Sequence, residues 1–251
     1  MDADGIDVTN IPRSSRAVIV TPSHQAPTGV VMSGARRRQL LELARTRDLM
    51  IVEDDYDTEY RYVERPLEPL QRLDTHGHVA YVGSFSKTLS PSLRLGFIVA
   101  PADLIAELTH VRHLIDTQPP HMTQATLASF ITSGGFERHL RRTGRIYRGR
   151  RDHLLAALER LRRNGTVESF DQCPAGLHLT VQLPERDQTA RVAERMQAAG
   201  IAIMTTAEHH VADRPLDLVI GFGLAGTTQI DQALEVLTRS WQTPGWRRKL
   251  D

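Results

Sequence analysis

The sequence has one cysteine, few aromatic residues and almost no net charge. The single Cys173 excludes an intramolecular disulfide and fits a reducing compartment. Lys and Arg number 31 against 30 Asp and Glu, so overall charge does not favour binding to nucleic acid or to a membrane surface. No apolar run reaches the roughly 18–20 residues that span a bilayer, and the acidic residues 1–7 are the reverse of a secretory signal. These absences predict a cytoplasmic protein.

What is present is typical of an α/β protein. Apolar runs without polar alternation predict strands that are buried on both faces, as in parallel sheets covered by helices, at residues 17–20, 49–52, 79–82 and 94–100. Helical spacing of apolar residues predicts helices at 36–47, 103–116 and 123 to about 163, the last interrupted at 133–135. Ser33 is the expected N-cap of the first helix.

The pattern changes after residue 165. An alternating strand is predicted at 177–183, an amphipathic helix at 189–199, a strand at 216–222 and a final helix at 230–241. We therefore expect an α/β region at residues 1–120, an interdomain helical region at 121–150 and a small α+β domain at 151–251.

Two polar segments each follow a predicted strand. They are Glu53-Asp-Asp-Tyr-Asp57 and Ser84-Phe-Ser-Lys-Thr-Leu89. Because binding groups in parallel sheets gather beyond the carboxyl ends of the strands, Asp54 and Lys87 should face one crevice. A lysine beside hydroxyls, with an acidic partner on the neighbouring strand, suits a Schiff-base cofactor whose ring nitrogen stays protonated.

The acidic segment alone allows three interpretations. It could be a solvated loop, a Mg²⁺ or Ca²⁺ site, or the partner of a cationic ligand. Its start inside an apolar strand disfavours a solvated loop, because an uncompensated charge is costly there. The serine-rich segment continues to Arg94, and hydroxyls with an arginine are good phosphate ligands.

Four strings in fixed order resemble a known family. Thr21-Pro-Ser-His-Gln25, Pro27-Thr-Gly29, Glu53–Asp57 and Ser84–Lys87, with Arg94 seven residues on, are similar to fold-type I pyridoxal-phosphate (PLP) enzymes. The similarity is to the aminotransferase-like domain of MocR regulators, a branch of the GntR family. It implies a partial PLP-binding large domain with a mainly parallel sheet, a small carboxyl-terminal domain, pyridoxal 5'-phosphate as cofactor, and a homodimer.

The resemblance also implies roles for individual residues. Lys87 would form the Schiff base with the cofactor and later act as general base. Asp54 would pair with the protonated pyridine nitrogen, and Tyr56 would bind the 3-oxygen of the ring. The phosphate would be held by Ser84, Ser86 and Arg94.

The sequence departs from the family pattern at two places. Ala26 stands where related aminotransferases carry an asparagine that contacts the 3-oxygen, so His24 or Gln25 would have to substitute. The last predicted strand lacks the arginine that often binds the substrate carboxylate, and His209 aligns with an alternative position for it. His209-His210 is not expected to be a metal pair, because adjacent side chains in a strand diverge.

Relatives in this family place a DNA-binding winged helix and the first part of the fold ahead of the matching region. We therefore expect a fragment that contacts DNA only through a domain outside this chain. Arginines gather at residues 138–151, where a solvated helix face is the expected explanation.

The predicted function is that of a PLP-binding, class I/II aminotransferase-like domain that reacts with an amino acid or amine. The alternative is a ligand-sensing effector domain of a MocR/GntR-type transcription regulator that does not turn its ligand over.

Overall fold

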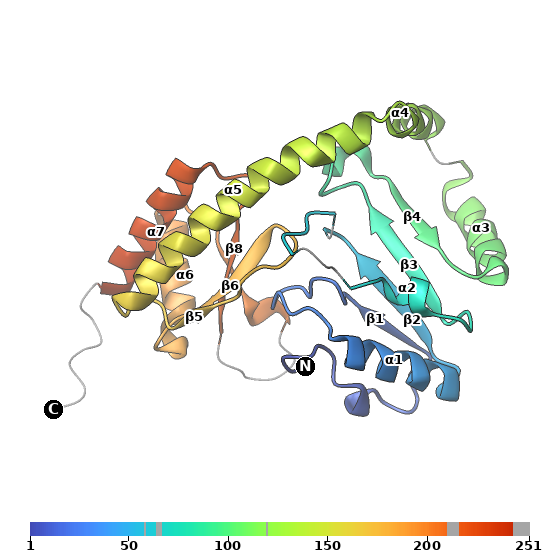
Figure 1. Cartoon of the computed structure of the whole chain (residues 1–251), viewed down its shortest axis with the longest axis horizontal. Helices are drawn as coiled ribbons and strands as arrows, with labels where there is room; N and C mark the ends of the chain where they lie inside the picture. Colours follow the sequence, from blue (N-terminus) through green and yellow to red (C-terminus); the bar gives the residue numbers. More distant parts are fainter. Residues whose placement is uncertain (58, 64–66, 119, 210–215, 243–251) are drawn as a thin grey trace. The chain divides into compact units, whose positions relative to one another are not determined.

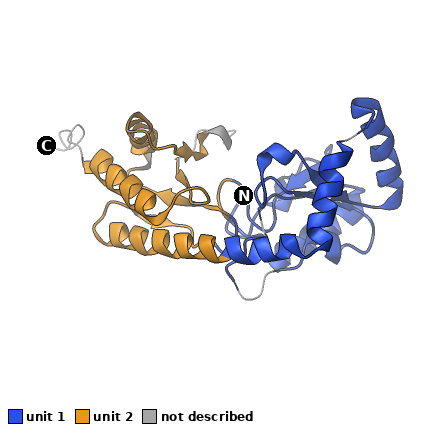
Figure 2. Cartoon of the chain, turned by 90° about the horizontal axis from the view of Figure 1, so that it is seen from above, with its two compact units in different colours: residues 1–26, 30–144, 174–176 blue, residues 27–29, 145–173, 177–251 orange. Residues whose placement is uncertain are grey.

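The computed structural model describes residues 1–57, 59–63, 67–118, 120–209 and 216–242. The chain divides into two compact units (Figure 2). Unit 1 comprises Met1–Ala26, Val30–Gly144 and Pro174–Gly176, and unit 2 comprises Pro27–Gly29, Arg145–Cys173 and Leu177–Asp251. Each unit has its own sheet.

The sheet of unit 1 has the order β1-β2-β3-β4 (Figure 1). Strands β1 (Ala17–Val20), β2 (Met50–Asp55) and β3 (Val79–Ser84) are parallel, as predicted, and β4 (Gly96–Val99) runs antiparallel to β3. The three parallel strands end at the same edge of the sheet. This edge carries the polar segments singled out in the sequence.

Helix α1 (Gly34–Arg47) covers this sheet through Leu40 and Ala44, which share a buried core with Ile51 and Val79. The Ser33 side chain accepts a hydrogen bond from the Arg36 amide, so the predicted N-cap is confirmed. The remaining elements of unit 1 are η1 (Val8–Asn10), α2 (Leu70–Leu73), η2 (Pro91–Leu93), α3 (Ala102–Asp116), α4 (His121–Thr132) and the first part of α5 (Gly135–Arg163).

The prediction that the strands are buried on both faces is wrong for β1 and β4. Ile19 on β1 is 71% exposed, and all four residues of β4 are exposed. Both strands lie at the edges of the sheet, and α3, which follows β4, has no buried residue. A continuous apolar run is compatible with burial of both faces of a strand. It does not show whether other residues of the described chain pack against those faces.

Unit 2 has an antiparallel sheet of order β5-β6-β8-β7. The predicted strands are β6 (His178–Gln182) and β8 (Leu218–Gly221), and the predicted helices are α6 (Thr189–Ala198) and α7 (Thr227–Gln242). Four short elements were not predicted, because two to four residues are too few to show a periodic hydrophobic pattern. They are the strands β5 (Ser169–Phe170) and β7 (Met204–Thr205) and the helices η3 (Arg186–Gln188) and η4 (Thr206–His209). Fully buried Leu179, Val181 and Leu237 form part of the core.

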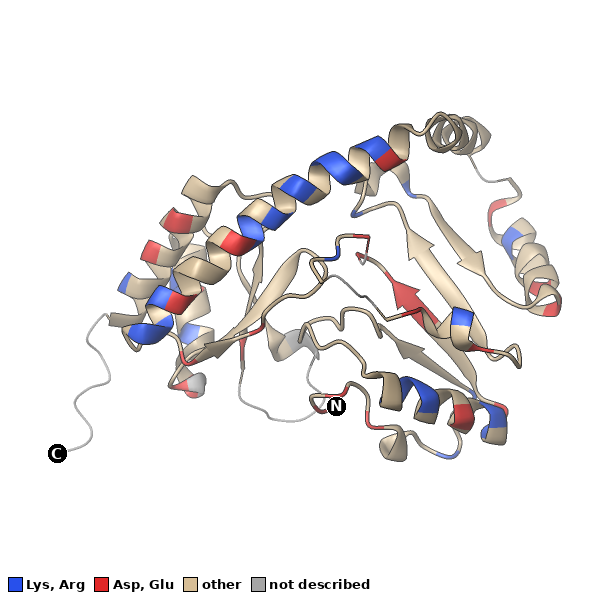
Figure 3. Ribbon diagram, viewed as in Figure 1, with Lys and Arg blue, Asp and Glu red and all other residues tan. Residues whose placement is uncertain are grey.

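Arginines recur along α5 (Figure 3). The predicted solvated face is confirmed for five of them, which are exposed: Arg138, Arg141, Arg142, Arg145 and Arg148. Arg151 instead binds the carbonyl oxygens of Cys173 and Gln172 at 2.8 and 2.9 Å, and Arg150 binds that of Gly223. Among the described residues, no helix combines the length and apolarity needed to cross a membrane.

Candidate functional site

The register of the parallel strands brings the polar segments to one edge of unit 1. Val20 of β1 lies beside Glu53 of β2, and Asp54 lies beside Val82 of β3. His24 therefore follows the end of β1, Asp54 lies at the end of β2, and the segment with Lys87 follows the end of β3. The expected convergence of these segments is a consequence of parallel pairing.

Three carboxylates of the acidic segment have protein partners. Glu53 is fully buried and accepts hydrogen bonds from the amides of Leu70 and Gln71, both at 2.9 Å. Asp55 accepts one from the Tyr81 hydroxyl at 2.7 Å. Asp57 contacts the His24 imidazole. The carboxylates therefore face separate partners instead of converging on one ion.

Asp54 is the exception in this segment. Its side chain is half-buried and makes no hydrogen bond or ion pair with the described part of the chain. Burial raises the pKa of the Asp54 carboxyl, and the neighbouring Asp55 and Asp57 raise it further. A cation bound at Asp54 would relieve both effects, which favours a cation-binding role of this residue over a solvated loop.

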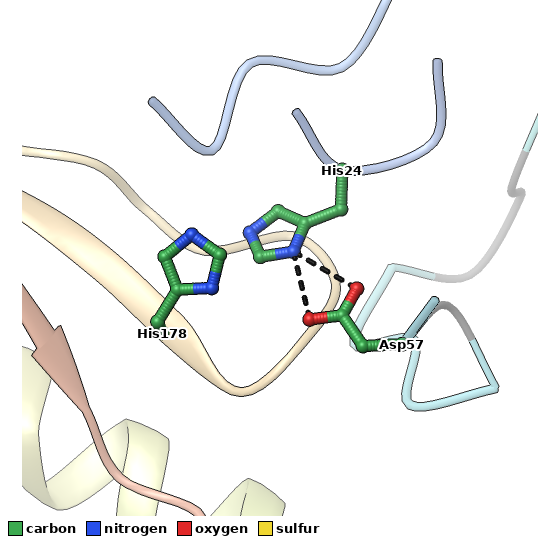
Figure 4. Close-up of side chains that lie close together, drawn as sticks. All are labelled: His24, Asp57 and His178. Carbon is green, nitrogen blue, oxygen red and sulfur yellow. Dashed lines mark hydrogen bonds and ion pairs between the residues drawn. The ribbon is translucent and has the colours of Figure 1, made fainter. Parts of the chain in front are cut away.

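His24 and Asp57 form a buried pair (Figure 4). The imidazole Nδ1 lies 3.1 Å from each carboxylate oxygen. The hydroxyl of half-buried Tyr56 lies 3.4 Å from the same nitrogen, and the two rings stack with centroids 6.2 Å apart. His24 and Tyr56 were candidate site residues in the sequence, whereas Asp57, the carboxylate that contacts His24, was not singled out.

The segment after β3 is held by its backbone. The Leu89 amide binds the Phe85 carbonyl oxygen at 2.9 Å, and the Ser86 amide binds Ser84 Oγ at 3.1 Å. Thr88 is buried, and its carbonyl oxygen contacts His139 Nε2 at 2.8 Å. The contact with His139 anchors the turn at Thr88. Sequence reasoning gave no signal for His139.

Lys87 is exposed, whereas Thr88 takes the inward position of the turn and Ser84 and Ser86 are half-buried. The Lys87 amine makes no hydrogen bond or ion pair with the described residues. It is therefore available to a ligand at this edge.

Arg94 ends η2 in the left-handed backbone conformation, with φ 51°, and its side chain is exposed. No hydrogen bond or ion pair joins the guanidinium to other residues that the structure describes. Gln25 is half-buried. Its backbone N–H donates to the Val30 carbonyl oxygen at 3.1 Å, and its side-chain Nε2 donates to the Ala26 carbonyl oxygen. The side chain of His209 lies outside the described part of the chain.

The donor set at this edge is an amine, a carboxylate with a raised pKa, a phenol, hydroxyls and a guanidinium. A parallel sheet with this set beyond its carboxyl ends is typical of the fold-type I PLP-dependent class. The sequence model of the family described as aminotransferase class I and II matches residues 2–237, so the chain belongs to this family.

The chain is similar to regulators and to enzymes. It is 33% identical over 247 residues to the HTH-type transcriptional regulator YhdI of Bacillus subtilis (strain 168), covering 96% of this chain and 51% of that protein. It is 41% identical over 183 residues to the probable rhizopine catabolism regulatory protein MocR of Rhizobium meliloti, covering 72% and 37%. The crystal structure of Pyrococcus horikoshii kynurenine aminotransferase matches with TM-score 0.83 and 29% identity, over 90% of this chain and 56% of that one.

These comparisons confirm the predicted family resemblance and the fold-type I architecture. The chain spans about half the length of the curated relatives it matches.

Proposed function

We propose that unit 1 binds pyridoxal 5'-phosphate, with the Lys87 amine attached to the aldehyde carbon of the cofactor. The observation that carries the proposal is Asp54, a half-buried carboxylate with a raised pKa and no partner among the described residues. A protonated pyridine nitrogen is the kind of cation that such a carboxylate stabilises. Asp54 also lies on the strand next to the one that leads to Lys87.

The other residues at this edge match the remaining groups of the cofactor. The Tyr56 hydroxyl suits the 3-oxygen of the ring, and His24 and Gln25 lie on the segment that should take over the role of the missing asparagine. The phosphate would be bound by the hydroxyls and the guanidinium of Ser84, Ser86 and Arg94.

When bound, the cofactor supplies an electron sink that acidifies the Cα–H bond of an attached amino acid or amine. The chain itself contributes the Asp54 carboxylate, which the positive charge of the ring nitrogen would hold in its ionised form, and an amine that can move a proton. The Lys87 Nζ would serve as the general base for the proton on Cα of the ligand. The ligand is proposed to be an amino acid or amine, with His209 as a candidate carboxylate partner.

A second candidate function is ligand sensing without turnover. It is supported by the similarity to HTH-type regulators, which for YhdI extends over 96% of this chain. In that case amino acid or amine binding at the same site would change the conformation of a transcription regulator. The two candidates differ in one product, because only an aminotransferase releases a keto acid.

The experiment that tests the cofactor proposal is absorbance spectroscopy on the purified protein with added PLP. A visible band is expected for the wild-type chain and its loss for Lys87→Ala. The chain offers a matched control, because it contains only one other lysine, Lys249. Lys249→Ala should keep the band, and a band that survives Lys87→Ala contradicts the proposal. Where the band forms, assaying keto acid after addition of amino acids separates turnover from sensing.

The proposal includes a homodimer in the cytoplasm. Apolar side chains on α3 are exposed, among them Leu114 at 69% and Ile115 at 72%, and exposed apolar surface of this kind supports an interface with another chain. Light scattering at several protein concentrations tests this, with a mass of twice 28.1 kDa expected. A monomeric mass at the highest concentration rejects the homodimer for this chain.

A further inference from the structure

We propose that the buried pair of His24 and Asp57 is a positioning device for the Tyr56 hydroxyl, which makes His24 a positioning residue. Asp57 fixes the imidazole in the tautomer with the proton on Nδ1, and this N–H fixes the direction of the Tyr56 hydroxyl. The part that concerns Tyr56 and a ligand rests on the proposed function above. The part that concerns the imidazole stands without any ligand.

The geometry of the pair determines the tautomer. An ionised carboxylate has acceptor oxygens and no proton to give, so the nitrogen that faces it must carry the hydrogen. Nδ1 of His24 lies 3.1 Å from Oδ1 and 3.1 Å from Oδ2 of Asp57, so both oxygens share one N–H. Both side chains are almost fully buried, at 0% and 2% exposure, which protects the contact from competing water.

The same N–H faces Tyr56. The Tyr56 hydroxyl lies 3.4 Å from Nδ1, and the two rings are near-parallel, at 25°, with centroids 6.2 Å apart. A protonated Nδ1 cannot accept a hydrogen bond, so the Tyr56 oxygen accepts from it. The hydroxyl hydrogen of Tyr56 is then directed away from Nδ1, and the 3-oxygen of the cofactor ring would be a suitable acceptor for it.

The segment Pro174–Gly176, which belongs to unit 1, holds the pair in place. The Gly176 amide binds the Tyr60 carbonyl oxygen, and the Tyr62 hydroxyl binds the Gly176 carbonyl oxygen, both at 2.9 Å. A side chain at Gly176 would begin 2.0 Å from Nδ1 of His24 and 2.6 Å from Oδ2 of Asp57. The pair is thus closed in by backbone and cannot move toward this segment.

The imidazole tautomer can be read directly. In a long-range ¹H–¹⁵N spectrum of the cofactor-free protein, Nδ1 of His24 should be protonated at neutral pH, and Asp57→Ala should move the proton to Nε2. The matched control is Asp231→Ala, which removes the carboxylate that contacts Nε2 of His153 at 2.7 Å in unit 2 and should leave the His24 signals unchanged. A wild-type signal without a proton on Nδ1 of His24 overturns the proposal. Asp57→Asn is the second variant if the alanine variant does not fold.

A double-mutant cycle tests the link to Tyr56. In PLP-loaded protein, His24→Phe should shift the pH midpoint of the visible band in the same direction as Tyr56→Phe, by about one pH unit, as expected for one hydrogen bond to a charged group. In the Tyr56→Phe background, His24→Phe should add nothing, because both changes remove the same hydrogen bond. His24→Gln, which keeps an N–H, should restore part of the shift.

Additive shifts in this cycle mean that His24 acts through the general structure and not through Tyr56, and they overturn the proposal. His153→Phe is the control for loss of a histidine elsewhere and should not move the midpoint. A wild-type protein that develops no band rejects the cofactor proposal, and the tautomer measurement then still decides the role of Asp57.

Discussion

The Glu53 carboxylate and the Arg37 guanidinium lie 4.0 Å apart, and both side chains are almost fully buried. Arg37 of α1 also donates to the carbonyl oxygens of Met32, Glu68 and Pro22, at 3.1, 3.0 and 2.8 Å. Glu53 binds the first amides of α2. This pair therefore ties α1, α2 and the segment after β1 to the strand that carries Asp54.

The first prediction concerns this pair. Glu53→Gln should lower the free energy of unfolding by about 3–5 kcal/mol, because it leaves a buried guanidinium without its counter-charge. Urea unfolding measures the change. Glu42→Gln is the control, since Glu42 pairs with Arg45 on the exposed face of α1 and should matter little. Equal effects of the two variants would contradict the role of the buried pair.

The second prediction concerns pH. Burial and neighbouring carboxylates raise the folded-state pKa of Asp54 above its ordinary value. A raised pKa means that the folded state binds the proton more tightly, so this contribution to stability is present at low pH and is lost as the pH rises through the folded-state pKa. The asparagine of the Asp54→Asn variant does not ionise, so the stability of this variant does not fall with the ionisation of residue 54.

The cofactor-free Asp54→Asn protein should therefore gain stability relative to wild type as the pH rises through that range, measured by urea unfolding from pH 4 upward. Adding PLP should reduce this gap, because the cofactor supplies a cation to Asp54. If the free energies of unfolding of wild type and Asp54→Asn change in parallel with pH, the folded-state pKa of Asp54 is not raised, and the prediction is wrong.

The third prediction concerns Gly176, whose φ is +79° and whose missing side chain makes room for His24. Gly176→Ala should destabilise the protein by more than the roughly 1–2 kcal/mol that a positive φ costs a residue with a Cβ. Gly165→Ala is the matched control, with φ +76° and no atom within 4 Å of the added Cβ. If both variants lose the same stability, the space beside His24 is not limiting.

Much of the fold was predictable because local pattern and tertiary structure agree. The apolar run at 49–52 overlaps the start of β2, and the serine before α1 caps that helix. The exposure of β4 was not predictable, because apolar residues on an edge strand look the same whether or not another segment covers them. The antiparallel direction of β4 also has no local signal, because it depends on the partner strand.

The candidate site was partly predictable for a similar reason. Asp54, Tyr56, Lys87 and Arg94 stand out by residue type and position after strands. The hydrogen-bond partners of the other carboxylates in the acidic segment are distant in sequence, such as Tyr81 for Asp55 and Leu70 for Glu53. Only the three-dimensional structure distinguishes Asp54 from its neighbours, because the distinction is the absence of such a partner among the described residues.

The central claim is that Lys87 carries the cofactor, and reductive trapping tests it most directly. Purified protein is mixed with PLP, reduced with borohydride, digested and analysed by mass spectrometry. The chain has only two lysines, Lys87 and Lys249, so a covalent adduct is assigned without ambiguity. We predict a pyridoxyl adduct on the peptide with Lys87 at a PLP concentration that leaves Lys249 unmodified. Equal labelling of both lysines, or labelling of Lys249 alone, would contradict the account.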